Sequence, residues 1–188
     1  NLAWGHLGPE VGPMEDNQFG TDEFLQFCEA VGAEPMLTAN VGSGTAQEAA
    51  DWVEYVNGSK DTKWGAARAR NGHPEPYRVK RWFIGNEIFG WHEIGHQTPE
   101  QYVKTFLEYA RAMRKVDPDL KLIPVGQHFP EGPKDGGFNK IVLDGVGAEA
   151  DYLSIHQYMP PGGAGNTLRY SVGKLHKTRL KRVYYEVM

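Results

Sequence analysis

The stretch Val79-Lys80-Arg81-Trp82-Phe83-Ile84-Gly85-Asn86-Glu87 decides the fold. Its largely apolar run stops abruptly at an Asn-Glu pair, which predicts a buried strand over residues 79–85. Interior strands of parallel α/β proteins are near-continuous apolar runs, and functional side chains collect where such strands end. We therefore expect Asn86 and Glu87 to lie at a functional rim of a parallel sheet.

Strand and helix patterns alternate along the rest of the chain. Helices are predicted to begin at Thr21, Thr45 and Thr98, the last two within S/T-x-x-E/Q capping boxes. Short helices are expected over residues 66–70 and 138–143 and a polar helix over 168–182, with further strands over 34–40, 120–126, 152–155 and 183–187. This alternation predicts an α/β fold with a parallel sheet and right-handed crossovers.

Length and composition narrow the function classes. The chain has 188 residues, so we expect residues 1–188 to form a single domain. A net charge of −4 and a pI near 6.0 argue against a nucleic-acid or anionic-membrane partner. Cys28 is the only cysteine, which excludes an intramolecular disulfide and favours a cytoplasmic location over secretion. Because the first residue is Asn1 rather than Met, the lack of a signal peptide is uninformative.

Two predicted strands end in polar groups of the kind that bind or cleave sugars. The first is Asn86-Glu87, followed by Phe89 and Trp91, and the second is the run Ser-Ile-His-Gln-Tyr at 154–158. A carboxyl group beside an amide suits a general acid in glycoside cleavage, and aromatic rings suit the apolar faces of sugars. His156 and Tyr158 are two residues apart, so both are expected to face the pocket of Glu87. The structural alternatives are a salt bridge for Glu87 and core packing for His156 and Tyr158.

Two other motifs suggest different chemistry. His92-Glu93-Ile94-Gly95-His96 matches the H-E-x-x-H zinc signature, which needs both histidines on one helical face. Gly95 and the preceding Gly-rich aromatic sequence favour a loop instead. Gly42-Ser43-Gly44 could cradle a phosphate at a helix start, but it lacks the lysine and spacing of a P-loop, which favours a tight βα turn.

Seven short segments form a set of motifs along the chain. Four of them are Gly-His-Pro-Glu-Pro-Tyr at 72–77, Gly-Asn-Glu at 85–87, Val-Asp-Pro at 116–118 and Ala-Asp-Tyr-Leu-Ser-Ile-His-Gln-Tyr at 150–158. The others lie at 17–24, 32–35 and 40–45. Together they resemble family 51 glycoside hydrolases, which are α-L-arabinofuranosidases with a (β/α)₈ catalytic barrel. The similarity runs in order from about Asn1 to Tyr158.

The resemblance implies roles for individual residues. Glu87 matches the family's general acid/base, and Asn86 matches the residue that binds the sugar's 2-hydroxyl. Four further residues match aromatic or polar groups that line the sugar pocket, namely His156, Tyr158, Trp4 and Trp91. A retaining mechanism with two carboxylates about 5–5.5 Å apart is implied, and it requires neither a metal nor an organic cofactor.

The chain also departs from the family's pattern. It begins after what would be the second strand of the barrel, and the resemblance fades after Tyr158. Glu186, on the last predicted strand, is the positional candidate for the nucleophile, in surroundings that differ from the family's motif. Five strands cannot close an eight-stranded barrel, and open strand edges invite pairing with another chain. We expect an incomplete barrel that is part of a longer polypeptide; the alternatives are an open sheet and a homo-oligomer.

The expected function is release of terminal α-L-arabinofuranosyl residues from arabinose-containing plant polysaccharides or oligosaccharides. One alternative is another retaining glycosidase of the same barrel clan, such as a xylanase or a β-glycosidase. The other is a truncated fragment that binds sugar or assembles without catalysis, because it lacks the nucleophile.

Overall fold

A computed structural model describes residues 18–127, 137–156 and 184–186, and the chain divides into two units, residues 1–35 and 36–188. The first unit contains helix α1 (Thr21–Val31). Its N-cap is Gly20 rather than the predicted Thr21, because the N–H of Gly20 donates to the side chain of Glu23 at 2.9 Å. Gly32 adopts a left-handed conformation with φ of 69° and ends the helix as predicted.

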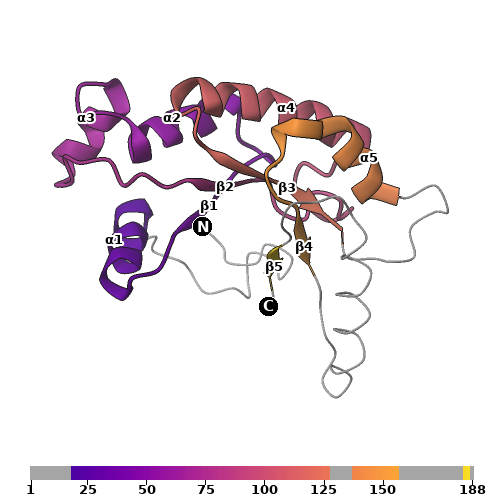
Figure 1. The fold of residues 1–188 in the computed structure, drawn as a ribbon, viewed down its shortest axis with the longest axis horizontal. Coiled ribbons are helices and arrows are strands. Elements are labelled where there is room, and N and C mark those ends of the chain that lie inside the picture. Colours follow the sequence, from indigo (N-terminus) through magenta and orange to yellow (C-terminus); the bar gives the residue numbers. More distant parts are fainter. Residues whose placement is uncertain (1–17, 128–136, 157–183, 187–188) are drawn as a thin grey trace, which may run out of the picture. The chain divides into compact units, whose positions relative to one another are not determined.

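The second unit contains a parallel five-stranded sheet in which the strands follow one another in chain order (Figure 1). The strands are β1 (Met36–Ala39), β2 (Arg81–Ile84), β3 (Lys121–Gly126), β4 (Ser154–His156) and β5 (Tyr184–Glu186). All five lie within the predicted ranges except at His156, which extends β4 by one residue. The prediction of a parallel α/β sheet is confirmed.

Helices lie between successive strands from β1 to β4, and those that follow Thr45 and Thr98 begin where the capping boxes predict. They are α2 (Ala46–Asn57), α3 (Lys63–Arg70), α4 (Pro99–Val116), α5 (Gly137–Val146) and the short 3₁₀ helix η2 (Gly147–Glu149). Thr45 accepts a hydrogen bond from the N–H of Glu48 at 3.1 Å, and Thr98 accepts one from Gln101 at 3.4 Å. The helix expected over residues 168–182 lies outside the described residues. Among the described helices, none combines the length and apolar character needed to cross a membrane.

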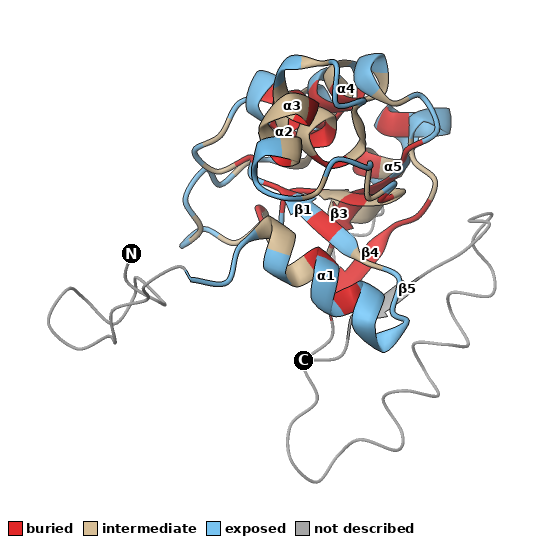
Figure 2. Cartoon of the chain, turned by 90° about the vertical axis from the view of Figure 1, so that its left-hand side faces the viewer, coloured by how far each residue is buried: buried red, intermediate tan, exposed pale blue. Residues whose placement is uncertain are grey.

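Helices α2, α4 and α5 lie side by side on one face of the sheet (Figure 1). The buried residues of α4 recur every three or four positions and include Tyr102, Phe106 and Met113, which is the spacing of a single helix face. Beneath the helices, Trp82 and Ile84 of β2 are fully buried, and Figure 2 shows that β3 and β4 are buried along most of their length. The core of this unit therefore lies between the sheet and this helix layer.

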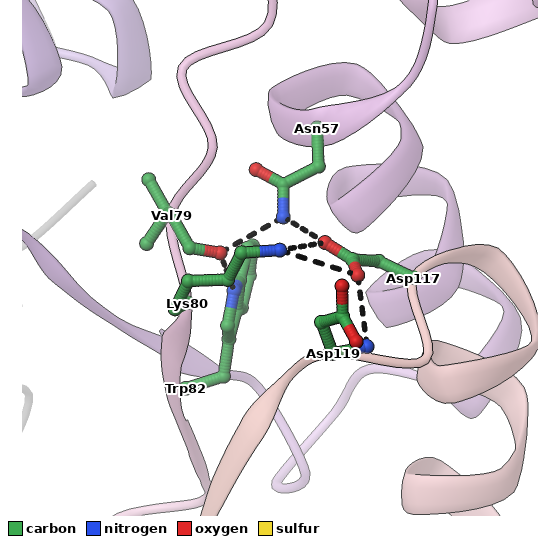
Figure 3. Close-up of polar contacts among 6 residues, drawn as sticks. All are labelled: Asn57, Val79, Lys80, Trp82, Asp117 and Asp119. Carbon is green, nitrogen blue, oxygen red and sulfur yellow. Dashed lines mark hydrogen bonds and ion pairs between the residues drawn. The ribbon is translucent and has the colours of Figure 1, made fainter.

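Asp117 joins three elements at the amino-terminal side of β2 (Figure 3). Its carboxylate accepts hydrogen bonds from the side-chain amide of Asn57 at 2.7 Å and from the backbone N–H of Asp119 at 3.0 Å. Lys80 pairs with it at 3.2 Å, and the same Asn57 amide donates to the carbonyl of Val79 at 2.8 Å. This one side chain holds together the end of α2, the start of β2 and the end of α4.

Replacing Asp117 with Ala is expected to lower the free energy of unfolding by about 1–3 kcal/mol, because the amide of Asn57 loses one of its two acceptors and Lys80 loses its ion-pair partner in a partly buried site. Asp119→Ala is the matched control, since Asp119 contributes its backbone N–H to the cluster and its side chain is exposed. Urea denaturation of both variants measures the difference. Equal midpoints would show that Asp117 does not hold these elements together.

Candidate active site

The carboxyl ends of β2 and β4 bring two predicted site residues into contact. Glu87 lies three residues after the end of β2, and His156 is the last residue of β4. Nδ1 of His156 and Oε1 of Glu87 are 2.8 Å apart, with exposed side-chain fractions of 4% and 16%. Because β3 lies between β2 and β4, this hydrogen bond spans the end of the intervening strand. Of the predicted site residues, the structure thus brings Glu87 and His156 together.

The backbone after β2 is left-handed at two positions. Gly85 has a φ of 84°, and a Cβ there would lie 2.6 Å from Cγ2 of Val41. Glu87 has a φ of 46°, which costs a residue with a side chain about 1–2 kcal/mol. The carbonyl of Glu87 then accepts a hydrogen bond from Gly90 at 2.7 Å, closing a turn. This strained turn sets the direction in which the Glu87 carboxyl leaves the strand end.

The loop after this turn, residues 88–97, is closed on itself and rests on the loop after β1. The carbonyl of the buried Ile88 accepts a hydrogen bond from Gln97 at 2.9 Å. Gly95, with a φ of 79°, packs against Gly42 so tightly that a Cβ on Gly95 would lie 2.5 Å from the Cα of Gly42. The two strand-end loops therefore support each other through direct backbone contact.

The H-E-x-x-H segment forms turns within this loop and is not helical, so its two histidines do not occupy successive turns of one helix face. His92 pairs with the adjacent Glu93 at 3.3 Å, whereas Nδ1 of His96 contacts the carbonyl of Ile88 at 3.2 Å. Within the described ranges, no cluster of three or more His, Cys, Asp or Glu side chains has the geometry to hold a metal. The loop interpretation of this motif is confirmed.

Residues 42–44 form the tight turn between β1 and α2 that the sequence predicts. Oδ1 of Asn40 accepts hydrogen bonds from the N–H groups of Gly42 at 2.9 Å and Ser43 at 3.2 Å. Its amide donates to Oγ of Ser43 at 3.1 Å. Asn40 was not among the predicted site residues, although an Asn before Gly and Ser at a strand end is typical of such a turn.

The other predicted site residues are placed as follows. Asn86 is exposed beside Glu87, and Trp91 is 86% exposed with its ring edge-on to His92 at 5.6 Å. Glu186 belongs to β5, where its Cα is in register with His156 of β4. Trp4 and Tyr158 lie outside the described residues.

Two aromatic rings support His156, and the sequence pointed to only one of them. The ring of Phe89 lies edge-on to His156, with centroids 6.5 Å apart, and the ring of Phe138 lies 5.7 Å from Phe89. Phe89 was expected near the site because it follows Asn86-Glu87. Phe138 stands at the start of α5, far from any predicted site motif, and no local sequence signal indicated it.

Residues 5–173 match the family described as "Alpha-L-arabinofuranosidase 1 domain". A similar curated protein is α-L-arabinofuranosidase C of Emericella nidulans, 46% identical over 129 residues, which are 69% of this chain and 24% of that protein. Another is the intracellular exo-α-(1→5)-L-arabinofuranosidase of Acetivibrio thermocellus, 34% identical over 84% of this chain and 30% of that protein. The chain thus spans 24% to 30% of the length of these relatives.

Among solved structures, the GH51 α-L-arabinofuranosidase of Thermotoga petrophila RKU-1 superposes with a TM-score of 0.77 at 38% identity. The superposition covers 88% of this chain and 34% of that one. The five-stranded sheet with its helices is therefore part of an α/β barrel, as predicted from the sequence.

Proposed function

This chain belongs to the α-L-arabinofuranosidase family of GH51 glycoside hydrolases, and from this premise we propose that it is part of the catalytic barrel of a retaining enzyme. The proposed reaction releases terminal α-L-arabinofuranosyl residues from arabinose-containing polysaccharides or oligosaccharides. Because the chain covers about a quarter of its curated relatives, the proposal concerns the whole polypeptide that contains it.

The contact between Glu87 and His156 carries the proposal. Glu87 is the acid that protonates the leaving oxygen and later the base that removes a proton from water. An acid/base of this kind needs a partner that fits both of its protonation states. A neutral imidazole can do this, since Nδ1 donates to the carboxylate in one tautomer and accepts from the carboxylic acid in the other. The distance of 2.8 Å allows either bond.

Glu186 is the proposed nucleophile. Its carboxylate attacks the anomeric carbon while the bond from that carbon to the leaving oxygen breaks and Glu87 supplies the proton. In the second step, water attacks the same carbon, Glu87 accepts its proton, and the ester to Glu186 is cleaved. The register of Glu186 with His156 supports this role, because it puts both positions at the same carboxyl end of neighbouring strands.

The remaining roles concern binding of the sugar. Asn86 is proposed to bind the 2-hydroxyl, and Trp4, Tyr158 and Trp91 to line the pocket. The exposure of Trp91 fits a contact with the sugar of the leaving group.

The proposal also covers the domain organisation of the chain, its location in the cell and its binding partner. The family match runs through both compact units, which supports one catalytic domain for residues 1–188. The name of the intracellular Acetivibrio relative supports a cytoplasmic location. The net charge of −4 supports a sugar partner in preference to nucleic acid or an anionic membrane.

A slow substrate tests both the sugar and the nucleophile. An arabinofuranosyl reagent with fluorine at C2 and a good leaving group is expected to label the intact enzyme covalently, because fluorine slows breakdown of the ester. Mass spectrometry should find the label on the peptide that contains Glu186. The matched xylosyl and glucosyl reagents should label the enzyme far more slowly. Preferential labelling by either of them would favour another retaining glycosidase, and a label on another carboxylate would remove Glu186 from its role.

A further inference from the structure

A tyrosine hydroxyl occupies a position between β2 and β3 that backbone hydrogen bonds would otherwise fill. At the start of the pair, the N–H of Lys121 donates to the carbonyl of Lys80 at 2.7 Å. The regular alternation of a parallel ladder then sets the N–H of Val125 opposite the carbonyl of Ile84. Instead, the N–H of Val125 donates to Oη of Tyr102 at 2.8 Å, and that hydroxyl donates to the carbonyl of Ile84 at 2.5 Å. Oη of Tyr102 is inserted into the ladder.

The hydroxyl is suited to this double role because it stays protonated. Tyr102 is fully buried, and burial raises the pKa of its hydroxyl, an effect that the hydrogen bond from Val125 partly offsets. The group therefore donates and accepts at the same time over the pH range in which proteins work. It separates the ends of β2 and β3 while leaving both backbone groups hydrogen-bonded.

The first consequence concerns Glu87. Ile84 is the last residue of β2 and precedes Glu87 by three residues. The carbonyl that Tyr102 binds thus lies directly before the left-handed turn at Gly85 and Glu87. A hydrogen bond at this point fixes where the turn starts, and so it fixes the place from which the Glu87 carboxyl reaches across β3.

The second consequence concerns His156. The ring of Tyr102 stacks on Phe138, with centroids 6.1 Å apart and an angle of 20° between the planes. Phe138 contacts Phe89 at 5.7 Å, and Phe89 lies edge-on to His156 at 6.5 Å. The same tyrosine that supports the strand end before Glu87 thus also supports, through two rings, the partner of Glu87.

We propose that Tyr102 is a positioning residue that holds Glu87 and His156 at hydrogen-bonding distance, by inserting its hydroxyl between β2 and β3 and by supporting the aromatic stack under His156. The proposal rests on the proposed function, because that function gives the distance between Glu87 and His156 its catalytic role. The distance itself can be measured without any assay of activity.

The test compares crystal structures of the full-length enzyme carrying Tyr102→Phe or Tyr109→Phe. Tyr109 is the matched control, because it lies on the same face of α4 and donates to a strand-end carbonyl, that of Asn40, at 3.0 Å. In Tyr102→Phe the ring remains, and Val125 and Ile84 can move together. We expect the separation of Glu87 and His156 to exceed about 3.5 Å in this variant and to stay unchanged in the control.

Kinetics give a second readout that simple destabilisation would not reproduce. Tyr102→Phe is expected to lower kcat about 10- to 100-fold for arabinofuranosides with a sugar leaving group, because the acid is misplaced. For a 4-nitrophenyl leaving group, which needs little protonation, the rate of the glycosyl-transfer step should fall much less. Loss of folded enzyme would lower both rates by the same factor.

An unchanged distance in Tyr102→Phe, or an equal loss for both leaving groups, would overturn the inference and leave the proposed function standing. If the unsubstituted enzyme is itself inactive on arabinofuranosides, a longer distance in Tyr102→Phe would still support the positioning role, while the proposed function would be refuted. If Tyr102→Phe does not fold, Phe138→Leu is used, which removes the stack under His156 and is expected to lengthen the same distance. An unchanged distance in that variant would equally overturn the inference.

Discussion

Replacing Glu87 with Gln in the intact enzyme is expected to lower kcat for arabinofuranosides with sugar leaving groups by about 10²- to 10⁴-fold, the range that a general acid contributes. Glutamine has nearly the shape of glutamate, so the turn at this position should keep its conformation. Its amide can still form a hydrogen bond with His156, which is 2.8 Å away in the native protein. The variant therefore removes proton transfer while it leaves the fold intact.

The leaving group and an added nucleophile separate the two roles of Glu87. With a 4-nitrophenyl leaving group, the first step should be nearly normal and the second slow, so a burst of nitrophenol is expected. Azide should then accelerate turnover, because it attacks the anomeric carbon and displaces the enzyme's carboxylate without needing a base. Glu93→Gln is the control, since Glu93 is a carboxylate of the same loop that pairs with His92. A rate near normal on the sugar leaving group would exclude Glu87 as the acid.

Replacing Arg68 with Met is expected to lower the free energy of unfolding by about 4 kcal/mol or more. Arg68 is fully buried and donates to three backbone carbonyls, those of Tyr55 at 2.6 Å and of His73 and Pro74 at 3.0 Å. A hydrogen bond to a charged group contributes about 1.5 kcal/mol at the low end, and three such bonds are lost together from a partly buried site. Urea denaturation measures the change.

The position of Tyr55 explains why so much depends on this arginine. Tyr55 is the third residue from the end of α2, so its carbonyl is among those without a partner inside the helix. The last turn of α2 has no basic residue of its own, and Arg68 of α3 brings a positive charge to its negative end. Arg68→Lys should recover only part of the stability, because an ammonium cannot replace the planar fork. Arg70→Met, at an exposed position of the same helix, should cost less than about 1 kcal/mol; a similar loss there would contradict this explanation.

Features that depend on neighbours in the chain were predictable. The capping boxes at Thr45 and Thr98 are local signals, and both helices begin where these predict. The run that ends at Asn86-Glu87 is a strand for the same reason. The cap of α1 was wrong by one residue, because Gly20 has no side chain to signal a cap and its N–H is bonded by Glu23.

Features that depend on contacts between distant segments were not predictable in the same way. The contact of Glu87 with His156 was expected only as a shared pocket, since the sequence does not determine how far apart two strand ends lie. Tyr102 lies on the buried face of its helix, but the hydrogen bonds of its hydroxyl to two strands could not be anticipated. Likewise, the sequence predicted a short helix at 66–70, and nothing in this segment distinguished the buried Arg68 from an exposed arginine.

The order of strands in the sheet is the order in which the ribosome makes them. Each strand from β2 to β5 therefore finds its partner already synthesised, and the sheet can grow from one side as the chain emerges. Glu87 and His156 are 69 residues apart, so their contact must wait until β4 has been added. We expect nascent chains to acquire most of the helix layer before they acquire the means to transfer a proton.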